Sequence, residues 1–143
     1  MSNLILRPSI FTFVAVLSFL VGCSFTEVDC VCSTEFVYIT VSAVDTSDSP
    51  VTDLDINVRV NRTGDILNVK QEQYLIDRGV YIVFHDGFKH TIPAKVNILG
   101  EELTVTGVGT TGRFEASFQI AVDSECACHV HMKSGPGEVV VED

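Results

Sequence analysis

The sequence predicts an all-β protein, a single β-sandwich of about seven strands that follows an N-terminal signal peptide. Three observations carry this prediction. Apolar residues recur at every second position in several short segments, which is the period of a half-buried strand. Clusters of Gly, Pro, Asn and Asp separate these segments at intervals typical of sandwiches. No segment between the clusters shows a sustained helical period.

The first 22 residues have the pattern of a secretory leader. One basic residue, Arg7, precedes an apolar run from Ile10 to Val21. This run is shorter than the roughly 20 residues that a membrane-spanning helix needs. The pattern therefore favours a cleaved leader. A signal anchor that stays uncleaved is the alternative.

The leader ends in Leu20-Val21-Gly22-Cys23, which resembles a bacterial lipobox. The resemblance implies cleavage before Cys23 and lipidation of that cysteine, so membrane lipid is the expected partner of the acylated residue. Ser24 differs from the aspartate that retains such lipoproteins at the inner membrane, so an outer membrane is the favoured location. The expected parts are a leader, a lipid-anchored tether and a β-sandwich domain, at residues 1–22, 23–34 and 35–143.

The charge balance excludes one class of partner. The chain has 9 basic and 19 acidic residues, a net charge of −10. Loss of residues 1–22 removes only Arg7, which leaves 8 against 19 and a net charge of −11. Phosphate backbones bind to clustered Lys and Arg, so we expect no nucleic acid partner.

The first two predicted strands alternate clearly. In Glu35–Val44 one face carries Val37, Ile39, Val41 and Ala43, and the other carries Phe36 and Tyr38. In Leu54–Val60 the apolar face carries Ile56, Val58 and Val60. Both patterns predict strands with one face toward a core.

Six further segments complete the expected set: Gly79–Phe84, Lys95–Leu99, Glu102–Val108, Arg113–Val122, Cys128–Lys133 and Glu138–Val141. Arg113–Val122 has the clearest alternation, with apolar residues at 114, 116, 118, 120 and 122. Asp65–Ile76 is ambiguous and is compatible with a strand or with one helical turn.

Four short motifs carry a family resemblance: Pro50-Val51, Leu54–Val58, Thr63-Gly64 and Gly79-Val80-Tyr81. They resemble the start of a carboxypeptidase regulatory-like domain. Arg113–Val141 is similar to small bacterial lipoproteins that carry such a domain. The resemblance implies an Ig-like, transthyretin-like sandwich of seven strands. It also implies an accessory or binding module that is not itself catalytic.

The cysteines indicate disulfide bonds. Without Cys23, four of the five remain in an exported and oxidising compartment: Cys30, Cys32, Cys126 and Cys128. Residues i and i+2 of an extended segment point to the same side, so two thiols can meet two thiols. An antiparallel meeting would join Cys30 to Cys128 and Cys32 to Cys126. A parallel meeting would join Cys30 to Cys126 and Cys32 to Cys128.

A metal site is the alternative use of the C-terminal cluster. Copper or zinc could take ligands from Cys126, Cys128, His129, His131 and Met132. Strand alternation, however, places His129 and His131 on the face opposite to the cysteines. We expect that face to be at least partly solvated, so that neither histidine contributes much to stability.

No catalytic motif is present, and we expect neither enzymatic activity nor a cofactor. The Gly-x-Ser-x-Gly elbow is absent. His85-Asp86-Gly87 is interpreted as a turn. The acidic turn between Asp45 and Asp55 is expected to be solvated, and calcium binding there is the alternative. Four aromatic residues are expected in the core: Phe36, Tyr38, Phe84 and Phe114.

The sequence therefore predicts a lipid-anchored module of the bacterial cell envelope. It would bind or support another envelope protein or a glycan, without catalysis. A periplasmic copper- or zinc-binding protein is the alternative function.

Overall fold

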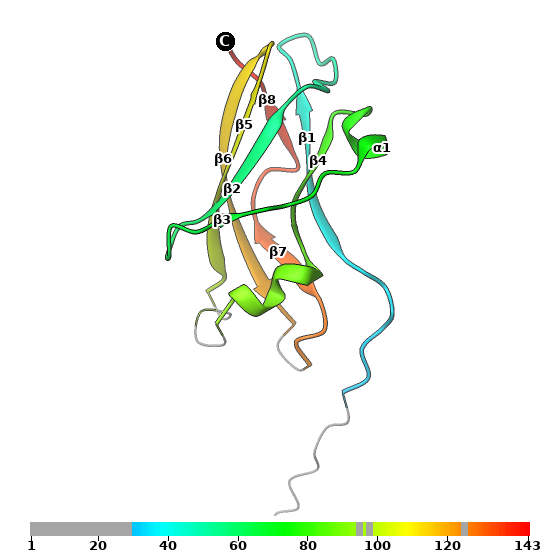
Figure 1. Cartoon of the computed structure of the whole chain (residues 1–143), viewed down its shortest axis with the longest axis vertical. Coiled ribbons are helices and arrows are strands. Elements are labelled where there is room, and N and C mark those ends of the chain that lie inside the picture. Colours follow the sequence, from blue (N-terminus) through cyan, green and yellow to red (C-terminus); the bar gives the residue numbers. More distant parts are fainter. Residues whose placement is uncertain (1–29, 94–95, 97–98, 124–125) are drawn as a thin grey trace, which may run out of the picture.

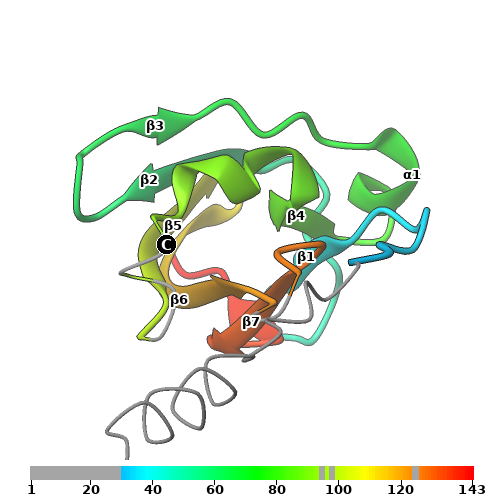
Figure 2. The same cartoon turned by 90° about the horizontal axis from the view of Figure 1, so that it is seen from below.

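The computed structural model describes residues 30–93, 96, 99–123 and 126–143. Within them the chain forms two β-sheets that face each other, which confirms the predicted all-β sandwich (Figure 1, Figure 2). The predicted leader, Cys23 and the first part of the tether lie outside the described residues. No helix among the described residues combines the length and the apolar character that crossing a bilayer requires.

The described residues contain eight strands and two short helical segments. The strands are β1 (Tyr38–Val44), β2 (Asp55–Val60), β3 (Ile66–Leu67), β4 (Val80–His85), β5 (Glu101–Gly109), β6 (Gly112–Val122), β7 (Val130–Ser134) and β8 (Glu138–Val140). The helical segments are α1 (Gln73–Ile76) and the 3₁₀ helix η3 (Asp86–Thr91). The ambiguous segment Asp65–Ile76 thus contains both a strand, β3, and a helical turn, α1.

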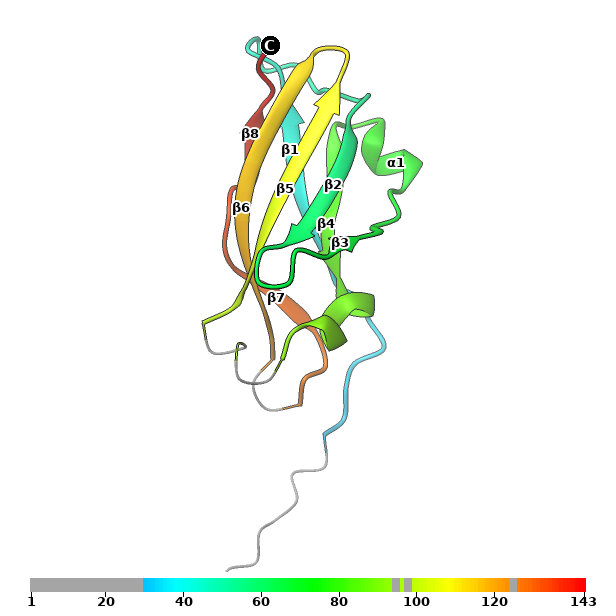
Figure 3. The ribbon, with the colours of Figure 1, turned by 60° about the vertical axis from the view of Figure 1, so that its left-hand side comes forward.

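One sheet has the strand order β4-β1-β8 and the other has the order β3-β2-β5-β6-β7. The five-stranded sheet is antiparallel throughout, and β2, β5 and β6 lie side by side in Figure 3. In the smaller sheet β1 runs antiparallel to β4 and parallel to β8. The N-terminal segment enters at the lower end of the sandwich in Figure 1, and the C-terminus lies at the upper end.

The core lies between the sheets and follows the predicted alternation. In β6, Phe114, Phe118 and Ile120 are buried, whereas Glu115 and Gln119 are exposed. The largest fully buried side chains include Tyr81, Phe84 and Phe118. Each large apolar side chain buried in this way contributes about 1.5–3 kcal/mol, so the core is the main source of stability.

Tyr81 connects β4 to the segment before β2 at the upper end. Its hydroxyl donates to the Val51 carbonyl at 2.9 Å and accepts from the Leu54 amide at 3.1 Å. Burial raises the pKa of Tyr81, so the hydroxyl keeps its proton and its donor role. Gly79 lets the chain pass here because its φ is +68° and a Cβ would lie 2.9 Å from the Ala43 carbonyl oxygen.

Two strand predictions are corrected. Lys95–Leu99 lies partly outside the described residues, and neither Val96 nor Leu99 is in a strand. The strand expected from Cys128 begins at Val130. Ala127 has a φ of +51° and its amide donates to the Asp123 carbonyl, so the chain turns where an extended segment was predicted.

Candidate functional site

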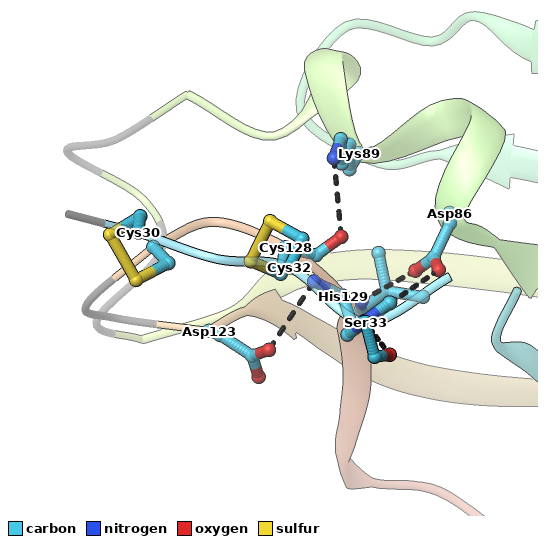
Figure 4. Close-up of a disulfide and its surroundings, with 10 residues drawn as sticks. Cys30, Cys32, Ser33, Asp86, Lys89, Asp123, Cys128 and His129 are labelled. Carbon is cyan, nitrogen blue, oxygen red and sulfur yellow. Dashed lines mark hydrogen bonds and ion pairs between the residues drawn. A yellow bond between two sulfur atoms is a disulfide. The ribbon is translucent and has the colours of Figure 1, made fainter. Parts of the chain in front are cut away.

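Two disulfides join the N-terminal segment to the segment before β7 at the lower end of the sandwich (Figure 4). Cys30 bonds to Cys126 and Cys32 bonds to Cys128, each across 96 residues. Equal separations mean that the two segments run parallel, which decides between the two predicted pairings. The Cα–Cα distances of 5.4 and 5.3 Å are ordinary for disulfides.

The bridges lie in the second part of the expected tether, residues 23–34. From Cys30 onward this segment is covalently attached to the sandwich. Both bridges close almost the same long loop. In the chain-entropy model, closing such a loop lowers the entropy of the unfolded chain and stabilises the fold by about 4–5 kcal/mol. The second bridge adds little to this stabilisation, because the first already closes the loop.

Asp86 organises the residues next to the bridges. It is 8% exposed and is the first residue of η3. Its carboxylate accepts from the Val37 amide at 3.0 Å, the Val130 amide at 2.8 Å and His129 Nδ1 at 2.7 Å. One buried carboxylate therefore joins η3 to the segment before β1 and to the start of β7.

The pKa of Asp86 lies below its ordinary value. Burial raises that pKa, but the hydrogen bond from His129, those from Val37 and Val130 and the charge of His129 together outweigh burial. Asp86 is thus an anion at neutral pH although it is buried. A buried anion with three donors is a strong acceptor for the imidazole of His129.

His129 bonds to two side chains. Its Nδ1 lies 2.7 Å from Asp86 Oδ2 and its Nε2 lies 2.9 Å from Ser33 Oγ. The carboxylate only accepts, so Nδ1 carries a hydrogen. In the neutral ring Nε2 then accepts the hydroxyl hydrogen of Ser33. The result is a continuous chain from Ser33 through His129 to Asp86 (Figure 4).

The two histidines differ in their exposure. His131 is solvated as expected, 49% exposed, with Nδ1 3.5 Å from Asp123. His129 was expected to be at least partly solvated, and its side chain is 20% exposed and paired with Asp86. Its exposure is smaller because Asp86 of η3 and Ser33 of the N-terminal segment both contact the ring.

The peptide group that joins Cys128 to His129 is also held at both its carbonyl and its amide. Lys89 Nζ donates to the Cys128 carbonyl at 3.1 Å, and the His129 amide donates to Asp123 Oδ2 at 3.3 Å. Figure 4 shows these contacts converging on the segment from η3 and from the end of β6. The position of the imidazole is thus fixed by a disulfide, a lysine and two carboxylates.

Next to this cluster lies an aromatic patch made of Phe36, Tyr38, His85 and Phe88. Ring centroids are 5.0 Å apart for Phe36 and Tyr38, 5.3 Å for Phe36 and His85, and 4.5 Å for His85 and Phe88. Phe36 is 50% and Tyr38 47% exposed, so their predicted place in the core is wrong. Both stand on the outward side of the segment that leads into β1. Phe84 and Phe114 are in the core as predicted.

The structure does not assemble the predicted metal ligands. Cys126 and Cys128 are in disulfides and so have no thiolate to offer. Both ring nitrogens of His129 are engaged, and Met132 is 40% exposed. Among the described residues, no three or more His, Cys, Asp or Glu side chains are grouped to hold a metal ion.

Ser33 and Asp86 are not among the site residues that the sequence predicts. One signal could have revealed Ser33, because Ser33 and His129 each follow a cysteine of the same bridge. A parallel pairing places such residues side by side, but the sequence left the pairing open. Asp86 carried no comparable signal, because its partners are 43 to 49 residues away in the chain.

A groove of about 920 Å³ lies at the other end of the molecule, where Arg113, Glu142 and Asp143 line it together with Val108. None of the predicted site residues contributes to it. The cluster around His129 is therefore a surface site, separate from this groove.

No family model matches the chain, and neither the curated proteins nor the solved structures contain a significant match.

Proposed function

We propose that the chain is a lipid-anchored, non-cytosolic module of the bacterial cell envelope. The observation that carries this proposal is the attachment of the segment after the expected anchor to the sandwich through two disulfides. A force on the anchor would pass directly into the folded domain. Such an attachment suits a module that is held at a membrane.

Two further observations support an exported location. Disulfides persist in oxidising compartments and are rare in the cytosol. The lipobox-like Leu20-Val21-Gly22-Cys23 leaves six residues between the expected anchor and Cys30 of the first bridge. The seven residue-to-residue steps from Cys23 to Cys30 span at most about 25 Å, so the sandwich would stay close to the bilayer surface.

The anchor is tested by lipid labelling. Cys23→Ser should abolish incorporation of labelled fatty acid and leave the leader uncleaved, because the acceptor thiol is lost. Ser24→Ala is the matched control and should be labelled like the wild type. Normal labelling of Cys23→Ser would show that the lipoprotein interpretation is wrong.

The aromatic patch is the proposed contact surface for an envelope protein or a glycan. Exposed aromatic side chains are enriched where proteins bind partners, and Phe36 and Tyr38 are about half exposed. The prediction can be tested with a photo-crosslinking residue at position 36 in living cells. Tyr74 of α1, which is 62% exposed and lies outside the groove, is the control. Equal adducts at both positions would argue against the patch, and protease or glycosidase treatment of an adduct would identify the partner class.

A further inference from the structure

Ser33, His129 and Asp86 have the connectivity of a nucleophile, a base and an orienting acid. Ser33 Oγ lies 2.9 Å from His129 Nε2, and His129 Nδ1 lies 2.7 Å from Asp86 Oδ2. The three residues come from separate parts of the chain. Triads of this kind are recognised by geometry and roles, whatever the order of the residues in the sequence.

The protonation pattern fits the same roles. The Asp86 carboxylate holds a hydrogen on Nδ1 of His129 and leaves the lone pair of Nε2 directed at the hydroxyl of Ser33. Two backbone amides, from Val37 and Val130, hold that carboxylate in place. The imidazole can thus take a proton from Ser33 while the buried carboxylate stabilises the imidazolium.

The hydroxyl of Ser33 is accessible, and its backbone is held in place. Ser33 is exposed, so a reagent can reach its hydroxyl. The residue before it, Cys32, is bonded to Cys128, the residue before His129. This bridge fixes the nucleophile against its base, although Ser33 lies outside the strands.

We propose that Ser33 is a nucleophile that accepts an acyl group from a carboxylic ester. Ser33 Oγ attacks the ester carbonyl, and its proton passes to His129 Nε2. The bond from the carbonyl carbon to the leaving oxygen breaks, and His129 returns the proton to the departing alcohol. Water then attacks the acyl-serine by the same route, which releases the carboxylic acid and restores Ser33. Asp86 acts through His129 and is a positioning residue.

The aromatic patch narrows the substrate class. The Val37 amide that binds Asp86 lies between Phe36 and Tyr38 in the chain, and His85 is the neighbour of Asp86. The aromatic patch therefore adjoins the Asp86 end of the triad, and Phe36 follows Ser33 by three positions in the chain. An ester with an apolar acyl chain fits these surroundings better than an ester with a charged acyl chain. This inference goes beyond the proposed function, does not depend on the lipid anchor, and departs from the sequence-based prediction that the chain is not an enzyme.

Selective labelling tests the nucleophile in the full-length protein in detergent. Diisopropyl fluorophosphate should phosphorylate Ser33 with loss of fluoride, as peptide mass spectrometry would show. Ser47 is an internal control, because it is exposed and its hydroxyl donates to Asp45 at 2.7 Å, a bond to a carboxylate with no histidine between them. Ser33 should react at least about a hundredfold faster than Ser47, the usual contribution of a general base. Equal rates would overturn the proposal and leave a structural hydrogen bond.

Turnover of p-nitrophenyl butyrate tests the second half of the cycle. Wild-type protein should release nitrophenolate, and Ser33→Ala should lower that rate to the level of buffer. Ser33→Ala is expected to fold, because the side chain is exposed and the disulfides remain. His129→Gln should remove selective labelling of Ser33, whereas Ser47→Ala should change neither measurement. Release by Ser33→Ala at the wild-type rate would overturn the proposal.

Discussion

Each end of the sandwich is organised by an aspartate, and the two aspartates differ in their exposure to water. At the lower end Asp86 is buried and accepts from two amides and His129. At the upper end Asp53 is exposed and accepts from the Thr110 amide at 2.9 Å and from the hydroxyls of Thr110 and Thr111. Both join segments that are more than 40 residues apart in the chain.

The pKa of both carboxyl groups is lowered, but the cause differs. For Asp53 the hydrogen bonds from Thr110 dominate. For Asp86 burial raises the pKa, and the donors must first overcome that penalty. Donors released at Asp53 return to water, whereas at Asp86 the buried amide of Val130 and the partly buried amide of Val37 would lose their acceptor. Loss of the carboxylate should therefore lower the free energy of unfolding more at the lower end than at the upper end.

The largest expected effect concerns the covalent bridges, which the described residues contain only at the lower end. Replacing all four bridged cysteines by Ala should lower the free energy of unfolding by about 4 kcal/mol. Loss of either bridge alone should cost clearly less, because the other bridge closes nearly the same loop. Urea unfolding of the three variants measures this, and additive losses would contradict the shared-loop explanation.

Asp86→Ala should be the next most damaging change. It leaves the Val37 and Val130 amides without their acceptor and removes the partner of His129, so we expect a loss of about 3 kcal/mol. Asp53→Ala is the matched change at the other end and should move the urea midpoint far less. Similar losses for the two variants would show that burial does not explain the difference between the ends.

The histidines allow a finer comparison within the lower end. His129→Ala should lower the free energy of unfolding by about 1–2 kcal/mol, because Asp86 loses its side-chain donor. His131→Ala should stay within about 0.5 kcal/mol, as is usual for exposed residues. A chelator should leave the wild-type curve unchanged. Equal losses for both variants, together with destabilisation by the chelator, would favour the metal-binding alternative.

The smallest expected effect is a pH dependence from His85. Burial lowers the pKa of His85, and the charge of Asp86 offsets this only in part. A base with a lowered pKa binds fewer protons when folded, so its contribution is complete above about pH 6.5 and is lost as the pH falls below that value. Protonation also removes the Nδ1 acceptor of the Gly87 amide, a bond of 3.0 Å. Unfolding of wild type and His85→Gln between pH 7.5 and 5.5 should show a steeper decline for the wild type.

Period-two alternation sufficed to predict most of the fold. It placed the core faces of Glu35–Val44, Leu54–Val60 and Arg113–Val122 correctly, because burial on one face of a pleated strand is a local property of the sequence. It failed for the expected strand at Lys95–Leu99 and for the start of β7. Before β7 the chain turns at Ala127, whose amide donates to the Asp123 carbonyl, and this turn interrupts the pattern.

Period-two alternation could not predict the candidate site. The aromatic residues Phe36 and Tyr38 stand on the outward side of the segment that leads into β1, opposite to the buried Ile39, so their β propensity gave no information about burial. The pairing of the cysteines depended on whether two distant segments run parallel. Neither point is encoded within a short window of sequence.

The sequence by itself determined the class of fold and the presence of four cysteines that can pair across the chain, because alternation and composition are local properties. Only the tertiary structure decided that Cys32 bonds to Cys128 and that Ser33, His129 and Asp86 meet. These contacts join residues 43 to 96 positions apart. Their geometry follows from how the two sheets pack and from which ends of the strands come together, and that arrangement exists only once the whole sandwich has formed.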